Sequence, residues 1–324
     1  MKYKCCRFMQ SGLNFHRNEI KFCNRLKNTG PVFPQDFNDL PAFIEKIRSM
    51  RDDIIKSCKS GIFDEACKHC ECLEEKEWIT SDKIEILEFN HWTNCNCYCI
   101  YCSSMIKNPK NHCVEIRKSD YVELFPVASY LIEKNLISQN AEIYFSGGEP
   151  TVLEEFPNIV NLLLSNNIRK ITVLTSGIRY SEDIEKILSS ETGWGCISID
   201  SGSSETYKKI KRRDKFNTVV DNIKKYLKSS EQASNNLELK YIILDDINDT
   251  TEEIDRWLYL CKDLGIKKTV LSIEYHNAPV EKAGEPLPKK YYELYDYAKN
   301  KAGELGLSLK AFEFFVTMME TGHY

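Results

Sequence analysis

From Ile84 onward, six short runs rich in β-branched and aromatic residues alternate with segments of helical periodicity. The predicted strands are Ile84–Phe89, Glu142–Phe145, Ile171–Leu174, Cys196–Ile199, Leu239–Leu244 and Val270–Ile273. The predicted helices are Asp120–Leu136, Glu154–Leu164, Glu182–Leu188, Glu205–Leu227, Glu252–Leu264 and Lys289–Leu305. Strands that alternate with helices in this way build a parallel sheet covered by helices. Because six repeats are too few to close a (β/α)8 barrel, we predict an α/β fold with a partial, open (β/α)6 TIM-like barrel.

The cysteine-rich segment before this barrel is predicted to be a small domain of its own. A chain of 324 residues suggests two domains, at about 150 residues per domain. Within the segment, a helix is predicted over Pro41–Ser60, with Cys58 on its apolar face and Gly61 as its stop. We therefore predict a cysteine-rich domain over 1–80, the barrel over 81–305 and a C-terminal tail over 306–324.

The composition excludes several classes of protein. Hydrophobic residues make up 42% and charged residues 28%, and the net charge of −4 gives no reason to expect nucleic acid as a partner. No apolar run reaches the ~18 residues that cross a bilayer, and the first residues lack the apolar stretch of a secretion signal, so we expect a cytoplasmic protein. Twelve of the 14 cysteines precede Val114, and in a reducing compartment such crowding indicates metal ligation.

Three cysteines follow the first predicted barrel strand in the stretch CNCYCIYC. Cys95, Cys99 and Cys102 are separated by three residues and then two, whereas Cys97 does not fit this spacing and is interpreted as a bystander. A cubane cluster has four irons, so a loop with three thiolates leaves one iron open to a small ligand. The alternative is structural zinc, but zinc closes its tetrahedron with four protein ligands and this spacing offers three.

Polar and glycine-rich motifs follow the next strands, at the edge where barrel active sites form. In FSGGEP, Gly147 and Gly148 permit close approach of the backbone to a ligand, and Glu149 supplies a carboxylate that could accept hydrogen bonds from an ammonium group. The alternative for this motif is an ordinary glycine turn with an exposed Glu. Thr175 and Ser176 follow the third strand, and their alternative is an ordinary polar strand end.

The fourth strand carries Ser198 and Asp200, which lie two residues apart and so share a face. Cys196 is on the same face and is a weak candidate for donating a hydrogen atom to a substrate radical, although a buried, inert thiol is favoured.

These motifs together resemble the radical S-adenosylmethionine (radical SAM) superfamily. The resemblance runs over roughly residues 84 to 275, from CxxxCxxC through GGEP and TSG at Thr175–Gly177 to SIDSGSSETYKKI at Ser198–Ile210. It implies a [4Fe-4S] cluster on Cys95, Cys99 and Cys102, whose open iron binds the amino and carboxylate groups of S-adenosylmethionine. It also implies that Ser198 and Asp200 face the ribose of this cofactor. One electron, expected from a reducing flavodoxin or ferredoxin, would release a 5′-deoxyadenosyl radical that abstracts a substrate hydrogen.

A second metal centre is predicted in the first eighty residues. A short CxxC pair joined to a distant pair is how tetrathiolate sites are built. The segment also resembles the auxiliary-cluster modules called twitch or SPASM domains, which usually follow the barrel in that family. The predicted ligands of a second iron–sulfur cluster, with zinc as the alternative and Cys5 and Cys72 as substitutes, are Cys6, Cys23, Cys67 and Cys70.

Two further groups of side chains have a structural interpretation. The basic run Lys208, Lys209, Lys211, Arg212 and Arg213 is predicted to be a solvated helix face rather than a site for a carboxylate or RNA. His91 and His276 near strand ends are interpreted as polar residues with satisfied hydrogen bonds.

The substrate class is left with several alternatives. A peptide or protein side chain is the leading substrate, because enzymes that resemble this one and carry auxiliary clusters often modify ribosomal peptides. A sugar or other small metabolite is the next alternative. RNA modification would need a basic domain, and none is evident at this net charge. The last alternative is a non-catalytic iron–sulfur or zinc protein, which predicts full thiolate ligation.

Overall fold

The computed structural model describes residues 2–17, 19–23, 39–64, 67, 70, 72–78, 82–102, 122–274 and 288–311. The chain divides into two compact units, the first formed by Met1–Thr93 with Glu115–Thr172 and the second by Asn94–Val114 with Val173–Tyr324. None of the helices in these described ranges is long and apolar enough to cross a membrane. The boundaries predicted at residues 80 and 305 stay a prediction.

The first unit contains a mostly parallel sheet. Its strands, in spatial order, are β6 (Ile137–Phe145), β5 (Ile84–Asn90), β2 (Gly12–His16) and β3 (Glu19–Lys21). Strand β5 runs parallel to both β6 and β2, and only β3 is antiparallel. The rings of Phe15, Phe89 and Phe145 are fully buried, and Phe89 lies 5.0 Å from Phe145 and 5.7 Å from Phe15 between ring centroids. The N-terminal segment therefore adds two strands to the sheet that begins the predicted barrel.

Helices of the first unit are α1 (Arg7–Ser11), α2 (Leu40–Lys59), α4 (Phe125–Glu133) and α5 (Phe156–Ser165), and a small sheet pairs β1 (Lys2–Cys5) with β4 (Glu74–Glu77). Helix α2 confirms the predicted helix to within one residue at each end. The Asp39 carboxylate caps it by accepting a hydrogen bond from the Ala42 amide at 3.0 Å. Its buried face includes Phe43, Ile47 and Cys58.

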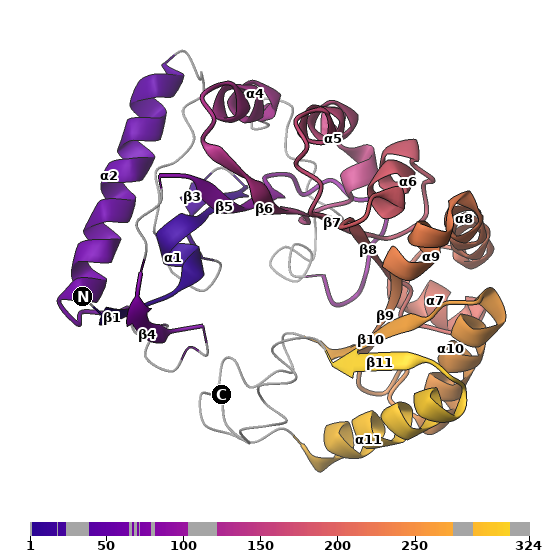
Figure 1. The fold of residues 1–324 in the computed structure, drawn as a ribbon. Helices are drawn as coiled ribbons and strands as arrows, with labels where there is room; N and C mark the ends of the chain where they lie inside the picture. Colours follow the sequence, from indigo (N-terminus) through magenta and orange to yellow (C-terminus); the bar gives the residue numbers. More distant parts are fainter. Residues whose placement is uncertain are drawn as a thin grey trace. The chain divides into compact units, whose positions relative to one another are not determined.

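The second unit alternates strands and helices along the chain (Figure 1). Its strands lie in the order β7 (Ile171–Thr175, from Val173 onward in this unit), β8 (Trp194–Ser198), β9 (Leu237–Ile243), β10 (Lys268–Ile273) and β11 (Ser308–Ala311). The pairs β8–β9, β9–β10 and β10–β11 are parallel. The helices are α6 (Glu182–Ser189), α7 (Ser204–Lys211), α8 (Phe216–Ser229), α9 (Glu231–Asn236), α10 (Thr251–Leu264) and α11 (Lys289–Glu304). All six predicted strands are present, and the predicted open α/β fold class is confirmed.

One predicted helix is wrong in a way that matters for the site. The segment Glu205–Leu227 was expected to form one helix, but it forms α7 and α8, separated at Arg212. Arg212 has a φ of +51°, in the left-handed region, and a residue in this conformation ends a right-handed helix. The break allows the last residue of α7, Lys211, to turn into the protein.

Glu142 on β6 stabilises the first unit through ion pairs with two basic side chains. Its carboxylate accepts two hydrogen bonds from the Arg7 guanidinium, at 3.1 and 3.2 Å, and one from Lys170 at 2.6 Å. Burial opposes ionisation, but these bonds and one from Tyr144 lower the pKa of Glu142 to about 2. Both cations are half-exposed, so solvent screening limits the benefit to about 1 kcal/mol.

We expect Glu142→Gln to lower the free energy of unfolding by about 1 kcal/mol at pH 7. Because the folded-state pKa lies below the ordinary value of 4.5, the difference should persist above pH 4.5 and vanish as the pH falls toward 2. Urea unfolding of both proteins across this range measures it. The exposed Glu133, changed to Gln, is the matched control. A difference that grows on acidification would contradict the assignment.

Candidate active site

The loop that follows β5 carries the three cysteines predicted to hold the catalytic cluster. Cys95, Cys99 and Cys102 are all partly buried. Cys97 lies between the first two: its amide donates to Cys95 Sγ at 3.4 Å, and its thiol makes hydrogen bonds with the thiols of Cys95 and Cys99. These bonds, followed by burial, leave the pKa of Cys97 at about 12 and raise that of Cys99 well above its ordinary value.

Within the described part of the chain, no three His, Cys, Asp or Glu side chains are arranged around a common metal position. The donor set nevertheless has the chemistry of a centre ligated by thiolates, because in one short loop the thiols of Cys95 and Cys99 both lie within hydrogen-bonding distance of Cys97. The Lys211 ammonium acts to lower the pKa of Cys99, but the hydrogen bond from Cys97 and burial outweigh it and the pKa stays raised.

Backbone contacts fasten this cysteine loop to the end of α7. The amides of Tyr98 and Ile100 donate to the carbonyl oxygens of Lys211 and Ile210, each at 3.0 Å. Arg213 donates from Nε to the Asn96 carbonyl oxygen at 3.1 Å, and its guanidinium lies 4.0 Å from the centroid of the Tyr98 ring. The side chains of Ile100 and Tyr101 pack against the buried cluster of Ile210, Ile242 and Leu244. These contacts therefore hold the cysteine loop against α7 within the second unit.

The basic run was predicted to be a solvated helix face, and for Lys211 this prediction is wrong. Lys208 and Lys209 are exposed, as expected for a solvated helix face, but Lys211 is only 2% exposed. Its ammonium donates to Asp200 Oδ2 and, at 2.7 Å, to the Tyr101 hydroxyl, which in turn donates to Asp200 Oδ2 at 2.6 Å. Burial alone would lower the pKa of Lys211, but the Asp200 carboxylate outweighs it and the pKa is raised. Through Tyr101, the buried ion pair of Lys211 and Asp200 therefore holds the cysteine loop in place.

Asp200 is itself held in an unusual backbone conformation just beyond β8. It is fully buried, and its φ of +57° lies in the left-handed region, which residues other than glycine seldom adopt. Its Oδ1 accepts a hydrogen bond from the Ile242 amide at 2.9 Å, and its carbonyl oxygen accepts one from Asn248 Nδ2 at 3.0 Å. With Oδ2 committed to Lys211 and Tyr101, this carboxylate positions other residues. The neighbouring Ser198 is partly exposed.

Cys196, the weak candidate for a hydrogen-atom donor, is 2% exposed, and burial raises its pKa to about 12. These are properties of an inert, buried thiol.

The GGEP turn belongs to the first unit and is tightly built. Gly147 has a φ of +106°, and a Cβ atom there would lie 2.5 Å from Asn90 Oδ1, so only glycine fits. The Gly148 amide donates to the Trp92 carbonyl oxygen at 3.0 Å. Glu149 is buried, and its carboxylate accepts hydrogen bonds from the Thr151 amide and hydroxyl at 3.2 and 2.8 Å. The carboxylate thus has a fixed orientation.

The turn after β7 contacts the cysteine loop directly. Ser176 Oγ donates to Asn96 Oδ1 at 2.9 Å, and Thr175 Oγ1 accepts from the Gly177 amide at 3.1 Å. Asn222 on α8 donates to the Gly177 carbonyl oxygen at 2.9 Å. In the second unit the structure therefore brings together the cysteine loop, the TSG turn and Asp200.

His91 confirms its interpretation as a buried polar residue with a partner. Its Nε2 donates to Glu155 Oε1 at 2.7 Å, and the same carboxylate accepts from the amides of Leu124 and Phe125 at the start of α4. Burial lowers the pKa of His91, so the ring is neutral. His276 lies outside the described residues.

Three site residues escaped the sequence analysis: Tyr101, Asn248 and the inward-facing Lys211. Their only signal was indirect. Tyr101 falls inside the cysteine motif, and Lys211 follows Asp200 by eleven positions, at the end of the helix after that strand.

The fold and site define a class of α/β protein whose cysteine-rich loop follows a strand of a parallel sheet, beside a buried ion pair. The sequence matches the profile of the Radical SAM superfamily over residues 89–258 of 324, so the chain belongs to this superfamily.

Among curated relatives, GTP 3′,8-cyclase of Clostridium botulinum is 27% identical over 184 residues, which are 56% of this chain and 53% of the relative. The enzyme of the same name from Petrotoga mobilis is 27% identical over 189 residues, 57% of this chain and 54% of the relative. The chain thus spans about half the length of the curated relatives it matches.

Among solved structures, Streptococcus suis SuiB bound to S-adenosylmethionine has a TM-score of 0.54 and 14% identity, covering 85% of this chain and 56% of SuiB. SuiB bound to its precursor peptide SuiA has a TM-score of 0.53 and 12% identity, covering 99% of this chain and 75% of that one. At these identities the likeness concerns the fold.

Proposed function

We propose that this chain is a radical SAM enzyme, with Cys95, Cys99 and Cys102 as ligands of a [4Fe-4S] cluster and S-adenosylmethionine as its cofactor. When bound, these groups supply one-electron cleavage of S-adenosylmethionine to a 5′-deoxyadenosyl radical that takes a hydrogen atom from the substrate. The proposed cofactor-binding residues are Gly147, Gly148, Glu149, Thr175, Ser176, Ser198 and Asp200. One observation carries the proposal: backbone hydrogen bonds attach the cysteine loop to the end of α7, and both lie inside the segment that matches the superfamily.

The chain's own residues have distinct parts in this proposal. Lys211 holds a positive charge beside Cys99. Asp200 and Tyr101 keep that ammonium in place through hydrogen bonds. Glu149 is buried and oriented by Thr151, in a turn where Gly147 leaves room for the Asn90 side chain. The protein thus binds, orients and balances charge, while the cofactor supplies the reactive group.

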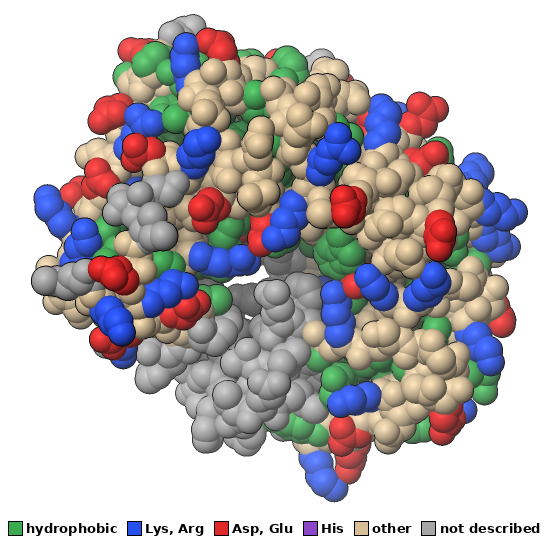
Figure 2. Space-filling view, viewed as in Figure 1, with side chains coloured by type: hydrophobic (Ala, Val, Ile, Leu, Met, Phe, Trp, Pro, Cys, Tyr) green, Lys and Arg blue, Asp and Glu red, His purple; other side chains and the backbone are tan. Residues whose placement is uncertain are grey.

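For the substrate we propose a peptide or protein side chain, supported by the likeness in fold to SuiB, one structure of which contains a precursor peptide. A small metabolite is the second candidate, supported by the sequence similarity to GTP 3′,8-cyclases. RNA modification has less support, because basic and acidic side chains are interspersed over the face drawn in Figure 2 and the net charge is −4. A reducing flavodoxin or ferredoxin in the cytoplasm is the proposed electron donor.

Formation of 5′-deoxyadenosine tests the activity. The chain is reconstituted anaerobically with iron and sulfide, then given S-adenosylmethionine and dithionite, and the nucleoside is measured by liquid chromatography. We expect Cys99→Ala to lose at least a hundredfold of this activity, because a cluster with two protein ligands is not retained. Cys261→Ala, at a fully buried cysteine on α10, is the matched control.

Iron content and far-UV circular dichroism separate loss of the cluster from loss of the fold. Unchanged 5′-deoxyadenosine formation in Cys99→Ala would overturn the proposal. Binding of S-adenosylmethionine without turnover by any reductant would favour the alternative of a non-catalytic iron–sulfur protein.

A further inference from the structure

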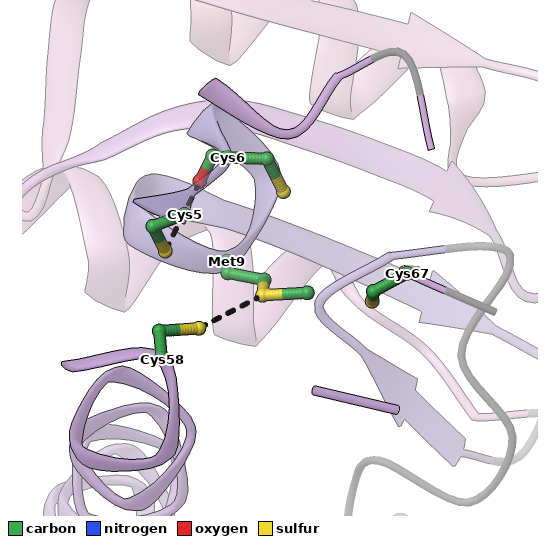
Figure 3. Packing of buried hydrophobic residues seen from close by; sticks show 5 residues of the cluster. All are labelled: Cys5, Cys6, Met9, Cys58 and Cys67. Atoms are coloured by element: carbon green, nitrogen blue, oxygen red, sulfur yellow. Dashed lines mark hydrogen bonds between the residues drawn. The ribbon is translucent and has the colours of Figure 1, made fainter. Parts of the chain in front are cut away.

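One buried hydroxyl near the cysteine loop has no hydrogen-bond partner in the described part of the chain. It belongs to Tyr207 on α7, whose side chain is fully buried. Buried polar groups in proteins nearly always have a partner, and one without a partner costs stability. In the first unit, for example, the buried Cys58 thiol donates to the Met9 thioether at 3.6 Å (Figure 3). The Tyr207 hydroxyl therefore needs an explanation.

Two observations place this hydroxyl close to the cysteine loop. Tyr207 precedes Lys211 by about one helical turn on α7, so both side chains project from the same face of the helix. On that face the Lys211 ammonium donates to the hydroxyl of Tyr101, a residue of the loop, at 2.7 Å. Burial raises the pKa of the Tyr207 hydroxyl, and the largest effects after burial come from Cys97 and Lys211, followed by that of Cys99. The hydroxyl thus lies in the neighbourhood of a proposed cluster ligand.

Packing holds the Tyr207 ring where it is. The ring lies edge-on to Phe216, with 5.7 Å between centroids. The amides of Tyr98 and Ile100 attach the loop to the last residues of the same helix. No thiol of the described loop accepts from the hydroxyl. Its acceptor must therefore come from outside the described residues, either as a water molecule or with the group that the loop binds.

We propose that the Tyr207 hydroxyl donates a hydrogen bond to a sulfur atom of the [4Fe-4S] cluster and thereby raises the reduction potential of the cluster. This inference rests on the proposed function, because it needs the cluster to be bound by Cys95, Cys99 and Cys102. Hydrogen bonds to the sulfur atoms are among the features that set the potential of an iron–sulfur cluster. Reduction adds negative charge to the cluster, and a donor beside a sulfur atom stabilises that charge.

Tyr207→Phe tests the proposal, because it removes the hydroxyl and keeps the ring. The full-length chain is reconstituted anaerobically with iron and sulfide, and the midpoint potential of its cluster is measured by redox titration with EPR spectroscopy, in the absence of S-adenosylmethionine. We expect Tyr207→Phe to keep about four irons per chain. We also expect an equilibrium constant for one-electron reduction at least threefold smaller, a shift of about 28 mV to lower potential at about 59 mV per tenfold change.

Tyr226→Phe is the matched control for the potential. Tyr226 is as fully buried as Tyr207, but its hydroxyl accepts a hydrogen bond from the Ser181 amide at 2.9 Å. We expect this variant to leave the potential unchanged. In the chain before reconstitution, it should lower the urea midpoint of unfolding, because the Ser181 amide loses its acceptor. Tyr207→Phe should leave that midpoint unchanged or raise it, because the hydroxyl that it removes has no partner.

Several results would overturn the inference. One is an unchanged potential in Tyr207→Phe, which is expected if a water molecule is the acceptor. Another is a lower urea midpoint of this variant before reconstitution, which would indicate a structural hydrogen bond. Loss of iron from the variant would indicate that Tyr207 retains the cluster and does not tune it. If the unsubstituted chain binds no iron that depends on Cys95, Cys99 and Cys102, the proposed function fails as well.

Discussion

Replacing Lys211 by methionine should lower the free energy of unfolding by about 3 to 5 kcal/mol, the cost of leaving one partner of a buried ion pair without the other. Both Lys211 and Asp200 are almost completely buried, and Tyr101 bonds to both. Without the ammonium, the Asp200 carboxylate would be left with the Tyr101 hydroxyl and the Ile242 amide as its hydrogen-bond donors. Chemical unfolding followed by circular dichroism measures the effect.

The double variant Lys211→Met with Asp200→Asn should recover part of this loss, because removing both charges also removes the unpaired one. Lys209→Met, on the exposed side of the same helix, should change stability by less than about 0.5 kcal/mol. A loss in Lys211→Met no larger than in Lys209→Met would contradict a buried ion pair at this place.

The second large effect is expected at Glu155. Its buried carboxylate accepts hydrogen bonds from His91 and from the amides of Leu124 and Phe125, which begin α4. Because Glu155→Ala leaves His91 and the Leu124 amide buried without their acceptor and removes the part-buried bond from Phe125, we expect a loss of about 3 kcal/mol in unfolding free energy. The exposed neighbour Glu154, changed to Ala, is the control and should change stability by less than about 0.5 kcal/mol.

The same pair predicts the direction of the pH dependence. Burial acts to raise the pKa of Glu155, but the bonds from His91 and the two amides leave it lowered, and burial lowers the pKa of His91. Both groups therefore bind protons less readily in the folded protein, so stability is full above pH 6.5 and falls on acidification. Unfolding at pH 7 and pH 5 should show this fall in the wild type and one at least as large in Glu155→Ala, because the carboxylate acts to raise the pKa of His91; a smaller fall in the variant would contradict it.

Sequence periodicity predicted the elements well, and the tertiary contacts poorly. The ends of α10 follow from its own residues: Thr250 Oγ1 accepts from the Glu253 amide at the start and Gly265 closes the helix, so both ends depend only on local sequence. Lys211 was misplaced because a basic run on a helix says nothing of which lysine meets a buried carboxylate on a preceding strand. Cys58 was assigned to an apolar helix face, and only packing against β1 and α1 reveals its sulfur neighbours.

The parallel pairing of β2 with β5 has a consequence for synthesis of this protein. Asn14 and Glu88, which are hydrogen-bonded side chains on these two strands, are separated by 74 positions. As the chain leaves the ribosome, β2 can pair with β3 on one edge, but its other edge has no partner until the residues of β5 emerge. The early nascent chain therefore exposes the apolar residues Leu13 and Phe15 until β5 has been made.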